Sequence, residues 1–259
     1  ITPFLQIGGD TSAKEGWRIA VSMIYGYTKD REQAWEIIEK LDLCSEQESK
    51  VQFTMADRKI NAVISTSVGR LFDAVSAILG IRRQSSFEGE ASMALEFAAE
   101  AYEQRKYEQQ ECEQEKYKQQ KNKYEPQQDV DGKLTGNEKT DRLVYENEER
   151  FILNTRMLVQ QIVEEKIQGA DSERLAYLFH QVLAEQITTV CIEARNNSGR
   201  NKAALSGGVF QNRLLLRLTE ERLMQEGFEV LRHHMIPPND GGIAIGQAAY
   251  GMWHLNNNI

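Results

Sequence analysis

Two glycine-rich turns near the end of the chain have residue types suited to binding an anion. The first contains Ser206, Gly207 and Gly208, and the second is the segment PPNDGGIAIGQ at 237–247. Glycine allows backbone N–H groups to approach a ligand closely, and the start of a following helix attracts negative charge. One such turn is a weak signal, because glycine is the usual residue in any tight turn. Two turns of this kind together predict a nucleotide-binding cleft.

The second turn also contains a carboxylate. Asn239 and Asp240 stand where a helix is expected to begin, after an extended approach fixed by two prolines. Aspartate is a common helix N-cap, so capping is the ordinary interpretation of Asp240 from the residue alone.

The elements that must position the turns follow from the hydrophobic spacing. A short apolar run at 202–205 precedes the first turn, a helical pattern covers 212–226 and ends at Gly227, and 228–231 is expected to be another strand. A strand, glycine turn, helix and strand in this order imply parallel strands with a right-handed crossover. Ligands of such units bind outside the carboxyl ends of the strands, where the first turn is placed.

Helical spacing also accounts for much of the remaining chain. Asp171 is a plausible N-cap for a long amphipathic helix, and Gly80 is a plausible C-cap for the helix that begins near Ser67. The other helices are expected at 15–26, at 33–41, from 89 onward and at 151–167.

A polar segment interrupts this pattern. Residues 101–128 are dominated by Glu, Gln, Lys and Tyr without a sustained apolar stripe. We therefore divide the chain into a helical connecting region with nucleotide-site blocks at 1–100, a polar insertion at 101–140, and a C-terminal α/β nucleotide-binding lobe at 141–259. The insertion is expected to be mobile or only loosely helical, and its removal is expected to leave the nucleotide site intact.

Composition narrows the class of protein. The chain is 41% hydrophobic with a net charge of -8, which disfavours nucleic acid as a partner because binding phosphates requires clustered Lys and Arg. No apolar run is long enough to span a membrane and no signal peptide is recognisable, so a cytoplasmic protein is expected. Cys44, Cys112 and Cys191 are an odd number of widely separated residues, so free thiols are expected.

Five sequence blocks resemble a known family. SGGVFQNRLLL at 206–216 and IPPNDGGIAIGQA at 236–248 resemble the end of the hydrogenase-maturation carbamoyltransferases, the HypF family, whose final domain is similar to the threonylcarbamoyl transferases that modify tRNA. The blocks at 8–18, 65–82 and 87–96 resemble three further family blocks in the same order.

The resemblance implies an α/β, helix-rich fold: one lobe of an actin-like ATPase (ASKHA) fold with additional helices. It also implies that the chain is the C-terminal part of a longer enzyme. The other lobe of the family's transferase domain, with a histidine pair that binds a metal ion, has no counterpart in this sequence.

The resemblance further implies site residues. Asp240 corresponds to an aspartate that completes the metal site, and the divalent metal remains open between zinc, iron and magnesium. The residues implied to bind the nucleotide are Asp73, Gly89, Gly207, Gly208 and Asn212. Gly69 and Arg70 receive no role. His180 lies on the buried side of an amphipathic helix, where it is expected to pack or to form a hydrogen bond. No residue is expected to act as a covalent nucleophile.

By resemblance, the complete enzyme uses carbamoyl phosphate and ATP to form carbamoyl adenylate. It then carbamoylates the C-terminal cysteine of a partner protein, HypE, and the product becomes a cyanide ligand of nickel-iron hydrogenase. This chain is expected to be inactive alone. The alternatives are a carbamoyltransferase acting on a small-molecule hydroxyl, a tRNA-modifying relative, and a stand-alone nucleotide-binding or interaction module.

Overall fold

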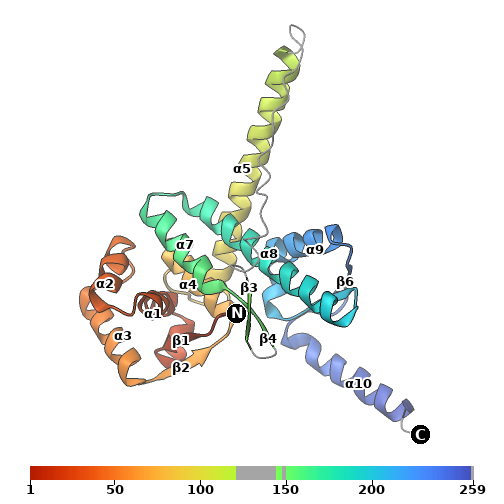
Figure 1. The fold of residues 1–259 in the computed structure, drawn as a ribbon, viewed down its shortest axis with the longest axis horizontal. Helices are drawn as coiled ribbons and strands as arrows, with labels where there is room; N and C mark the ends of the chain where they lie inside the picture. The colour runs from red at the N-terminus through yellow and green to blue at the C-terminus, as the bar shows by residue number, and fades with distance from the viewer. Residues whose placement is uncertain (121–143, 148–149, 258–259) are drawn as a thin grey trace.

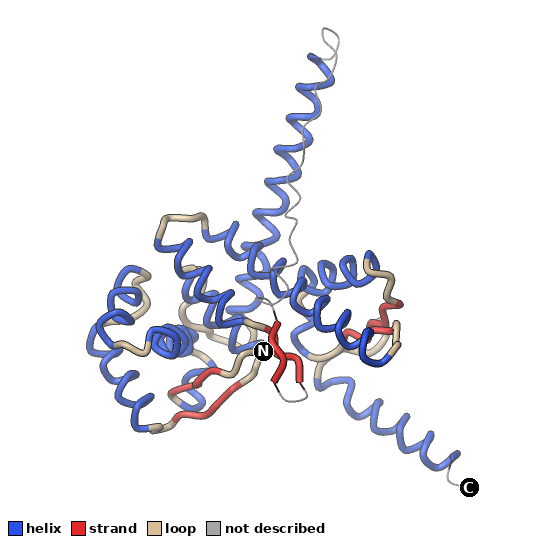
Figure 2. The backbone as a smooth tube through the Cα atoms, in the orientation of Figure 1, coloured by secondary structure: helices blue, strands red, loops and turns tan. Residues whose placement is uncertain are grey.

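The structure is a computed structural model that describes residues 1–120, 144–147 and 150–257, and it is dominated by helices (Figures 1 and 2). The helices are α1 (Gly16–Thr28), α2 (Arg31–Lys40), α3 (Glu46–Arg58), α4 (Val68–Ile78), α5 (Glu90–Gln120), α7 (Thr155–Ile167), α8 (Ser172–Ser198), α9 (Arg213–Gln225) and α10 (Ile243–Asn257). The strands are β1 (Phe4–Ile7), β2 (Ala62–Ser65), β3 (Val144–Asn147), β4 (Arg150–Leu153), β5 (Lys202–Leu205) and β6 (Glu229–Arg232). Short 3-10 turns are η1 (Gly9–Ala13), η3 (Gly208–Gln211) and η4 (Asp240–Gly242).

The helical body is held by one large apolar core to which α1, α4, α5, α7, α8 and α9 contribute. Its largest fully buried side chains include Trp17, Phe72 and Phe179, and the rings of Phe72 and Phe179 meet edge to face at 4.9 Å. α8 runs through the centre of the molecule between α5 and α9 (Figure 1). The apolar stripes that identified these helices in the sequence are therefore the surfaces that hold the body together.

β5 and β6 pair in parallel, as the sequence predicted. One face of this pair packs on α8 and α9 through a small apolar cluster that includes Leu205, Leu223 and Phe228. Ala204 and Leu231 pair in register on the opposite face, and both are exposed. The pair thus has one packed face and one open face.

Several element boundaries match the sequence predictions. Asp171 caps α8 by accepting a hydrogen bond from Arg174 N at 3.0 Å, Gly80 has a left-handed φ of 70° after α4, and Gly227 has one of 80° after α9. The expected helix at 151–167 is wrong at its start, because residues 150–153 form β4 and Asn154 caps α7. Four elements, β1, β2, β3 and α3, were not predicted from the sequence.

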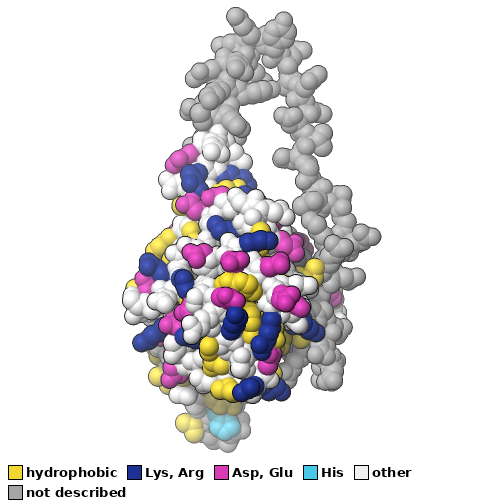
Figure 3. Space-filling view, turned by 90° about the vertical axis from the view of Figure 1, so that its left-hand side faces the viewer, with side chains coloured by type: hydrophobic (Ala, Val, Ile, Leu, Met, Phe, Trp, Pro, Cys, Tyr) yellow, Lys and Arg dark blue, Asp and Glu magenta, His cyan; other side chains and the backbone are white. Residues whose placement is uncertain are grey.

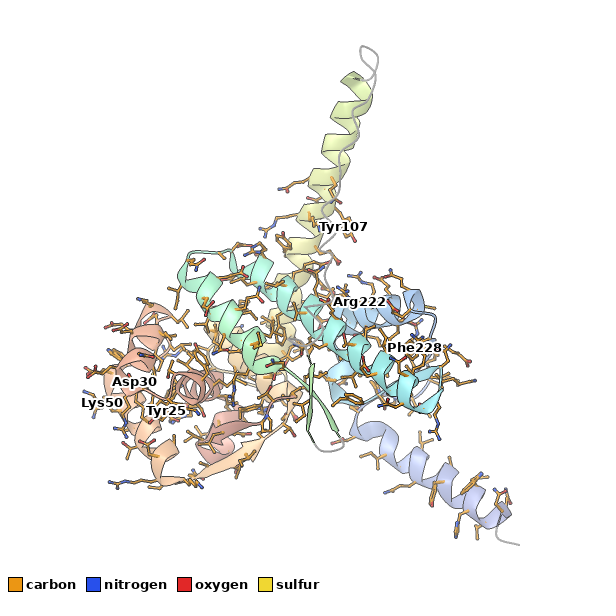
Figure 4. All side chains as sticks on the ribbon, in the orientation of Figure 1. Tyr25, Asp30, Lys50, Tyr107, Arg222 and Phe228 are labelled. Atoms are coloured by element: carbon orange, nitrogen blue, oxygen red, sulfur yellow. The ribbon has the colours of Figure 1, made fainter. Side chains whose placement is uncertain are left out.

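α5 continues across the predicted boundary between residues 100 and 101, as far as Gln120. The first residues of the expected insertion pack on the body: the rings of Tyr102 and Tyr177 lie 5.7 Å apart, and Glu103 accepts a hydrogen bond from the Tyr177 hydroxyl at 3.0 Å. Glu103 also pairs with Arg217 of α9. Tyr107 lies near the point where α5 leaves the body (Figure 4). The remainder of the expected insertion, at 121–143, lies outside the described residues.

α10 extends away from the body at the C-terminal end (Figure 1). It has no buried residue, and its exposed apolar side chains include Tyr250, Met252, Trp253 and Leu255. In the part of the chain that the structure describes, no helix combines the length and the apolar character needed to cross a membrane.

These contacts predict different outcomes for two deletions. Replacing 101–140 with a Gly-Ser linker removes the contacts of Tyr102 and Glu103, whereas replacing 109–140 keeps them. We expect the larger replacement to melt about 5 °C below the smaller one, because one to two kcal/mol of packing and hydrogen bonding is lost. Thermal unfolding followed by circular dichroism measures this, and equal melting temperatures would show that residues 101–108 contribute nothing to the body.

Candidate functional site

The two glycine turns meet in space at the carboxyl ends of β5 and β6. Gly207 N donates a hydrogen bond to Pro238 O at 2.9 Å, and a Cβ atom on Gly208 would lie 4.0 Å from Asn239 Cβ. Gly207 has φ of 99° and ψ of 158°, a backbone conformation that is essentially restricted to glycine. The structure therefore brings together Gly207, Gly208 and the turn that contains Asp240.

The second turn is capped by Asn239, and not by Asp240. Asn239 Oδ1 accepts a hydrogen bond from Gly241 N at 3.1 Å, and Asn239 O accepts one from Gly242 N at 2.9 Å. A Cβ atom on Gly242 would lie 2.7 Å from Pro237 O, so this position requires glycine. The capping interpretation of Asp240 is wrong, and its carboxylate is exposed with no hydrogen bond or ion pair to any described residue.

Backbone N–H groups are available at the first turn. Within the described chain, the N–H groups of Gly208 and Val209 donate to no protein acceptor. Both lie at the start of η3, beside the exposed Ser206. Adjacent free N–H groups at a turn form an ordinary binding site for a phosphate oxygen.

The start of α9, by contrast, is already occupied by the protein's own carboxylate. Glu96 Oε1 of α5 accepts hydrogen bonds from Arg213 N at 2.6 Å and from Leu214 N at 3.2 Å. Burial raises the pKa of Glu96, and the two N–H groups oppose that shift. These two N–H groups at the helix start are therefore not free for a ligand, whereas those of Gly208 and Val209 are. Sequence reasoning missed Glu96 because its partners are far away along the chain.

Asn212 lies behind the turn and is buried. Its Oδ1 accepts a hydrogen bond from Leu215 N at 2.7 Å, which caps α9, and its Nδ2 contacts His180 Nε2 at 3.0 Å. His180 Nδ1 lies 2.7 Å from Ala176 O, so Nδ1 carries the proton and Nε2 accepts from Asn212. Burial lowers the pKa of His180 to about 4, which keeps the ring neutral. The expectation that His180 packs and hydrogen-bonds inside the helix agrees with these contacts, while the nucleotide contact of Asn212 stays a prediction.

Two of the three upstream blocks, 8–18 and 65–82, meet at a second place, around Asp73. Arg70 pairs with Asp73 at 2.9 Å and donates to Ala13 O at 2.7 Å, and a Cβ atom on Gly16 would lie 2.5 Å from Asp73 O. Ser85, two residues before the third block, donates its N–H to Lys14 O at 2.7 Å.

The carboxylate of Asp73 is buried, and its pKa is raised. Burial raises the pKa of Asp73 to about 6, and Arg70 only partly offsets the shift. Although Oδ2 lies within ion-pair distance of Arg70, it accepts no well-aligned hydrogen bond from the described residues. The 2.9 Å separation means that Arg70 attracts the carboxylate of Asp73. Because no well-aligned hydrogen bond accompanies this attraction, the effect of burial on the pKa of Asp73 is larger than that of Arg70.

The two clusters are joined through the helical core. Phe72, next to Asp73, packs edge to face on His180 at 5.4 Å, and His180 holds Asn212 behind the η3 turn. Gly89, the other predicted nucleotide residue, precedes α5 with φ of 82° and open space beside its Cα. The structure thus links Asp73 to Asn212 through two side chains, Phe72 and His180, while Gly89 makes no contact that assigns it to either cluster.

The described residues do not form a complete metal site. Among residues 1–120, 144–147 and 150–257, no group of three or more His, Cys, Asp or Glu side chains converges. Asp240 offers one hard oxygen ligand, which is fewer than the three or four protein ligands of a zinc site. The described residues therefore do not by themselves fit the metal that the sequence predicted.

A cavity in the described structure lies away from both glycine turns. It has a volume of about 410 Å³ and is bounded by β1, α1, the end of α3 and α7, with Tyr25, Lys29 and Arg156 among its lining residues. It contains neither glycine turn. The turns instead lie on an open surface, as expected for half of a cleft.

Comparison with known proteins identifies the family. Residues 1–247 match the family described as "Carbamoyltransferase, Kae1-like Domain, second subdomain". This chain belongs to the HypF carbamoyltransferases. It is 27% identical to the probable carbamoyltransferase HypF of Methanocaldococcus jannaschii over 93% of the chain, and 30% identical to the carbamoyltransferase HypF of Rhodobacter capsulatus over 100% of the chain. It spans only 27% and 28% of those two HypF proteins.

Solved HypF structures support the fold. A crystal structure of full-length HypF in the phosphate- and nucleotide-bound form matches 96% of this chain with a TM-score of 0.72 and 27% identity, and the chain covers 28% of it. HypF of T. kodakarensis matches 99% of the chain with a TM-score of 0.70 and 21% identity, and the chain covers 30% of it. The predicted fold class is confirmed: an α/β, helix-rich lobe of the actin-like type with additional helices.

The raised pKa of Asp73 predicts a pH dependence of stability. Because the folded-state pKa of about 6 lies above the usual value of 3.8, the folded protein binds more protons, so stability falls as pH rises from about 4 to about 6. The full difference corresponds to about 3 kcal/mol. Asp73→Asn, which buries no charge, should gain stability relative to wild type over this range and keep a constant advantage above it.

Urea unfolding of both proteins at pH 4, 5, 6 and 7 measures this difference. Asp57→Asn is the control, since hydrogen bonds from Arg31 and Tyr25 lower the pKa of that exposed carboxylate. A pH-independent difference for Asp73→Asn would show that Asp73 stays ionised in the fold.

Proposed function

We propose that this chain is the C-terminal part of an enzyme that uses carbamoyl phosphate and ATP, through carbamoyl adenylate, to carbamoylate the C-terminal cysteine of HypE. The product serves cyanide ligand synthesis in nickel-iron hydrogenase maturation. The observation that carries the proposal is the meeting of two glycine turns at the carboxyl ends of parallel strands, in a chain whose relatives are named carbamoyltransferases. A solved relative described as phosphate- and nucleotide-bound supports a nucleotide at such a site.

The η3 turn is the part of this surface suited to the phosphate of the adenylate. Its free N–H groups at Gly208 and Val209 are fixed before the ligand arrives, because Gly207 is tied to Pro238 and Asn212 is tied to His180. Fixed donors stabilise an anion without a reorganisation cost, which is how a rigid site contributes to catalysis. The turn would hold the leaving AMP group in place while the carbamoyl carbon is attacked.

The nucleophile is expected from the partner, because the described thiols of this chain are poorly suited to the role. Burial raises the pKa of Cys44 to about 11 and also raises the pKa of Cys191. A thiol with a raised pKa contains little thiolate, the reactive form. A cysteine at the end of a partner chain, free of such burial, is chemically better suited.

Surface charge agrees with a protein or small-molecule partner. On the face shown in Figure 3, Lys and Arg side chains are interspersed with Asp and Glu among the described residues. A nucleic-acid partner would require a basic patch or stripe. We propose carbamoyl phosphate, ATP and HypE as the partners, and no nucleic acid.

We further propose that Asp240 is one ligand of a divalent metal ion whose other ligands lie outside this chain. Its carboxylate is exposed beside the nucleotide turn, and Asn239 has taken over the capping role that would otherwise occupy it. The chemistry such an ion supplies is neutralisation of phosphate charge. The remaining steps of the proposal depend on this chain's own groups.

Asp240→Asn in the full-length enzyme should separate the two reactions. We expect carbamoyl transfer to fall by about 100-fold and bound divalent metal to decrease, while pyrophosphate release during adenylate formation stays within about twofold of wild type. Metal content by mass spectrometry, pyrophosphate release and thiocarboxamide formation on HypE are the measurements.

Glu226→Gln is the matched control, because Glu226 is an exposed carboxylate of the same lobe, just after α9. Asn239→Ala is a poorer control, since it removes the cap of η4. Equal loss of both reactions in a folded Asp240→Asn protein would contradict the assignment.

A further inference from the structure

Ser206 and His233 form a hydrogen-bonded pair at the edge of the proposed site. Ser206 Oγ lies 2.8 Å from His233 Nε2, and both residues are exposed. Ser206 directly precedes Gly207 and the free N–H groups of η3. None of the nucleotide or metal assignments uses either residue.

The strand register explains why the two side chains meet. Leu205 and Arg232 are the last paired residues of β5 and β6, so Ser206 and His233 are the next residues along each strand. Side chains alternate between the faces of a strand, and the previous pair on this side is Ala204 with Leu231, which lies on the open face. Ser206 and His233 therefore extend the open face at the end where a ligand of parallel strands binds.

The pair contributes little to folding. A hydrogen bond between two exposed groups competes with water and stabilises a protein only weakly. His233 Nδ1, the second ring nitrogen, has no partner among the described residues. An exposed histidine that is oriented through one nitrogen and open at the other has the arrangement of a general base.

The hydroxyl of Ser206 can set the tautomer of this ring. A serine hydroxyl has one proton to donate and can also accept, whereas a phosphate oxygen only accepts. When a phosphate lies at η3, Ser206 donates its proton to the phosphate and its oxygen accepts from His233 Nε2–H. Neutral His233 then carries its proton on Nε2, and Nδ1 is left unprotonated.

We propose that His233 is the general base for the acceptor thiol and that Ser206 is a positioning residue which couples this base to the bound adenylate. The inference rests on the proposed function. The thiol proton moves to His233 Nδ1 as the sulfur attacks the carbamoyl carbon. The new C–S bond forms, the bond between the carbamoyl carbon and the phosphate oxygen breaks, and AMP leaves with that electron pair.

This arrangement makes the base dependent on the substrate. Without a phosphate at η3, Ser206 is free to donate to Nε2, which favours the tautomer with a protonated Nδ1 that cannot accept from the thiol. With the adenylate bound, the opposite tautomer is favoured. The thiol is thus activated only when there is a carbamoyl group to receive.

The test uses the full-length enzyme loaded with carbamoyl adenylate and then mixed with HypE, with thiocarboxamide formation followed by mass spectrometry in a single turnover. His233→Gln should slow transfer by about 100-fold, the usual contribution of a general base, and leave adenylate formation within about twofold. For His233→Ala, added imidazole should restore part of the transfer rate, which a merely structural role would not show. Ser206→Ala should slow transfer by about tenfold, and Ser206→Thr, which keeps the hydroxyl, should restore it.

His234→Gln is the matched control. It is the adjacent exposed histidine, has no serine partner among the described contacts, and should transfer at the wild-type rate. Equal rates of carbamoyl transfer for His233→Gln and His234→Gln would overturn the role of His233 and leave the proposed function standing. Loss of adenylate formation in His233→Gln would have the same consequence. Absence of transfer by the wild-type enzyme would overturn the proposed function and this inference with it.

Discussion

The geometry of the candidate site depends on the two hydrogen bonds of the Asn212 side chain. One caps α9, and the other ties the end of η3 to His180 inside the core. Both groups of the amide are used, and the neutral state of His180, ensured by burial, keeps Nε2 an acceptor. Without this link, the Gly207 turn would be attached to the helical body through β5, α9 and the apolar packing of Val209 and Phe210. A buried polar contact of this kind costs desolvation, and it is retained where it fixes a unique arrangement.

Around Asn212, the N–H groups that a structural carboxylate occupies and the N–H groups that stay free belong to different segments. Glu96 takes the N–H groups at the start of α9, so the helix is satisfied without a ligand. The N–H groups of η3, a few residues earlier, stay free on the surface. The adjacent Asn239 performs a similar separation in the second turn, because it caps η4 and leaves the carboxylate of Asp240 exposed. Each turn therefore has one residue that fixes its backbone, Asn212 or Asn239, and other polar groups that stay exposed.

The spacing of residues along the chain predicted the helices and strands around the site. The contacts of individual site residues depend on partners that are far apart in the sequence. The parallel β5 and β6 pair, the caps at Asp171 and Gly227, and the family itself followed from spacing and motif residues. Glu96, His180 and Asp73 have functions that depend on partners brought together by the fold, which no periodicity records. α3 has a signal that was available, because Ser45 and Glu48 form a capping box. The polar start of the expected insertion concealed its contacts, since Glu103 binds Tyr177 and Arg217 through polar atoms.

We propose above all that a phosphate binds the free N–H groups of the η3 turn, beside the turn that contains Asp240. Hydrogen–deuterium exchange of the full-length protein with and without saturating AMP tests this claim most directly. We predict slowed exchange in peptides covering 206–211 and 239–243, with the amides of Gly208 and Val209 slowed most. The N–H groups at the start of α9 should not change, because Glu96 already occupies them. Slowed exchange at the start of α9 without a change at 206–211, or no change in either segment, would contradict the account.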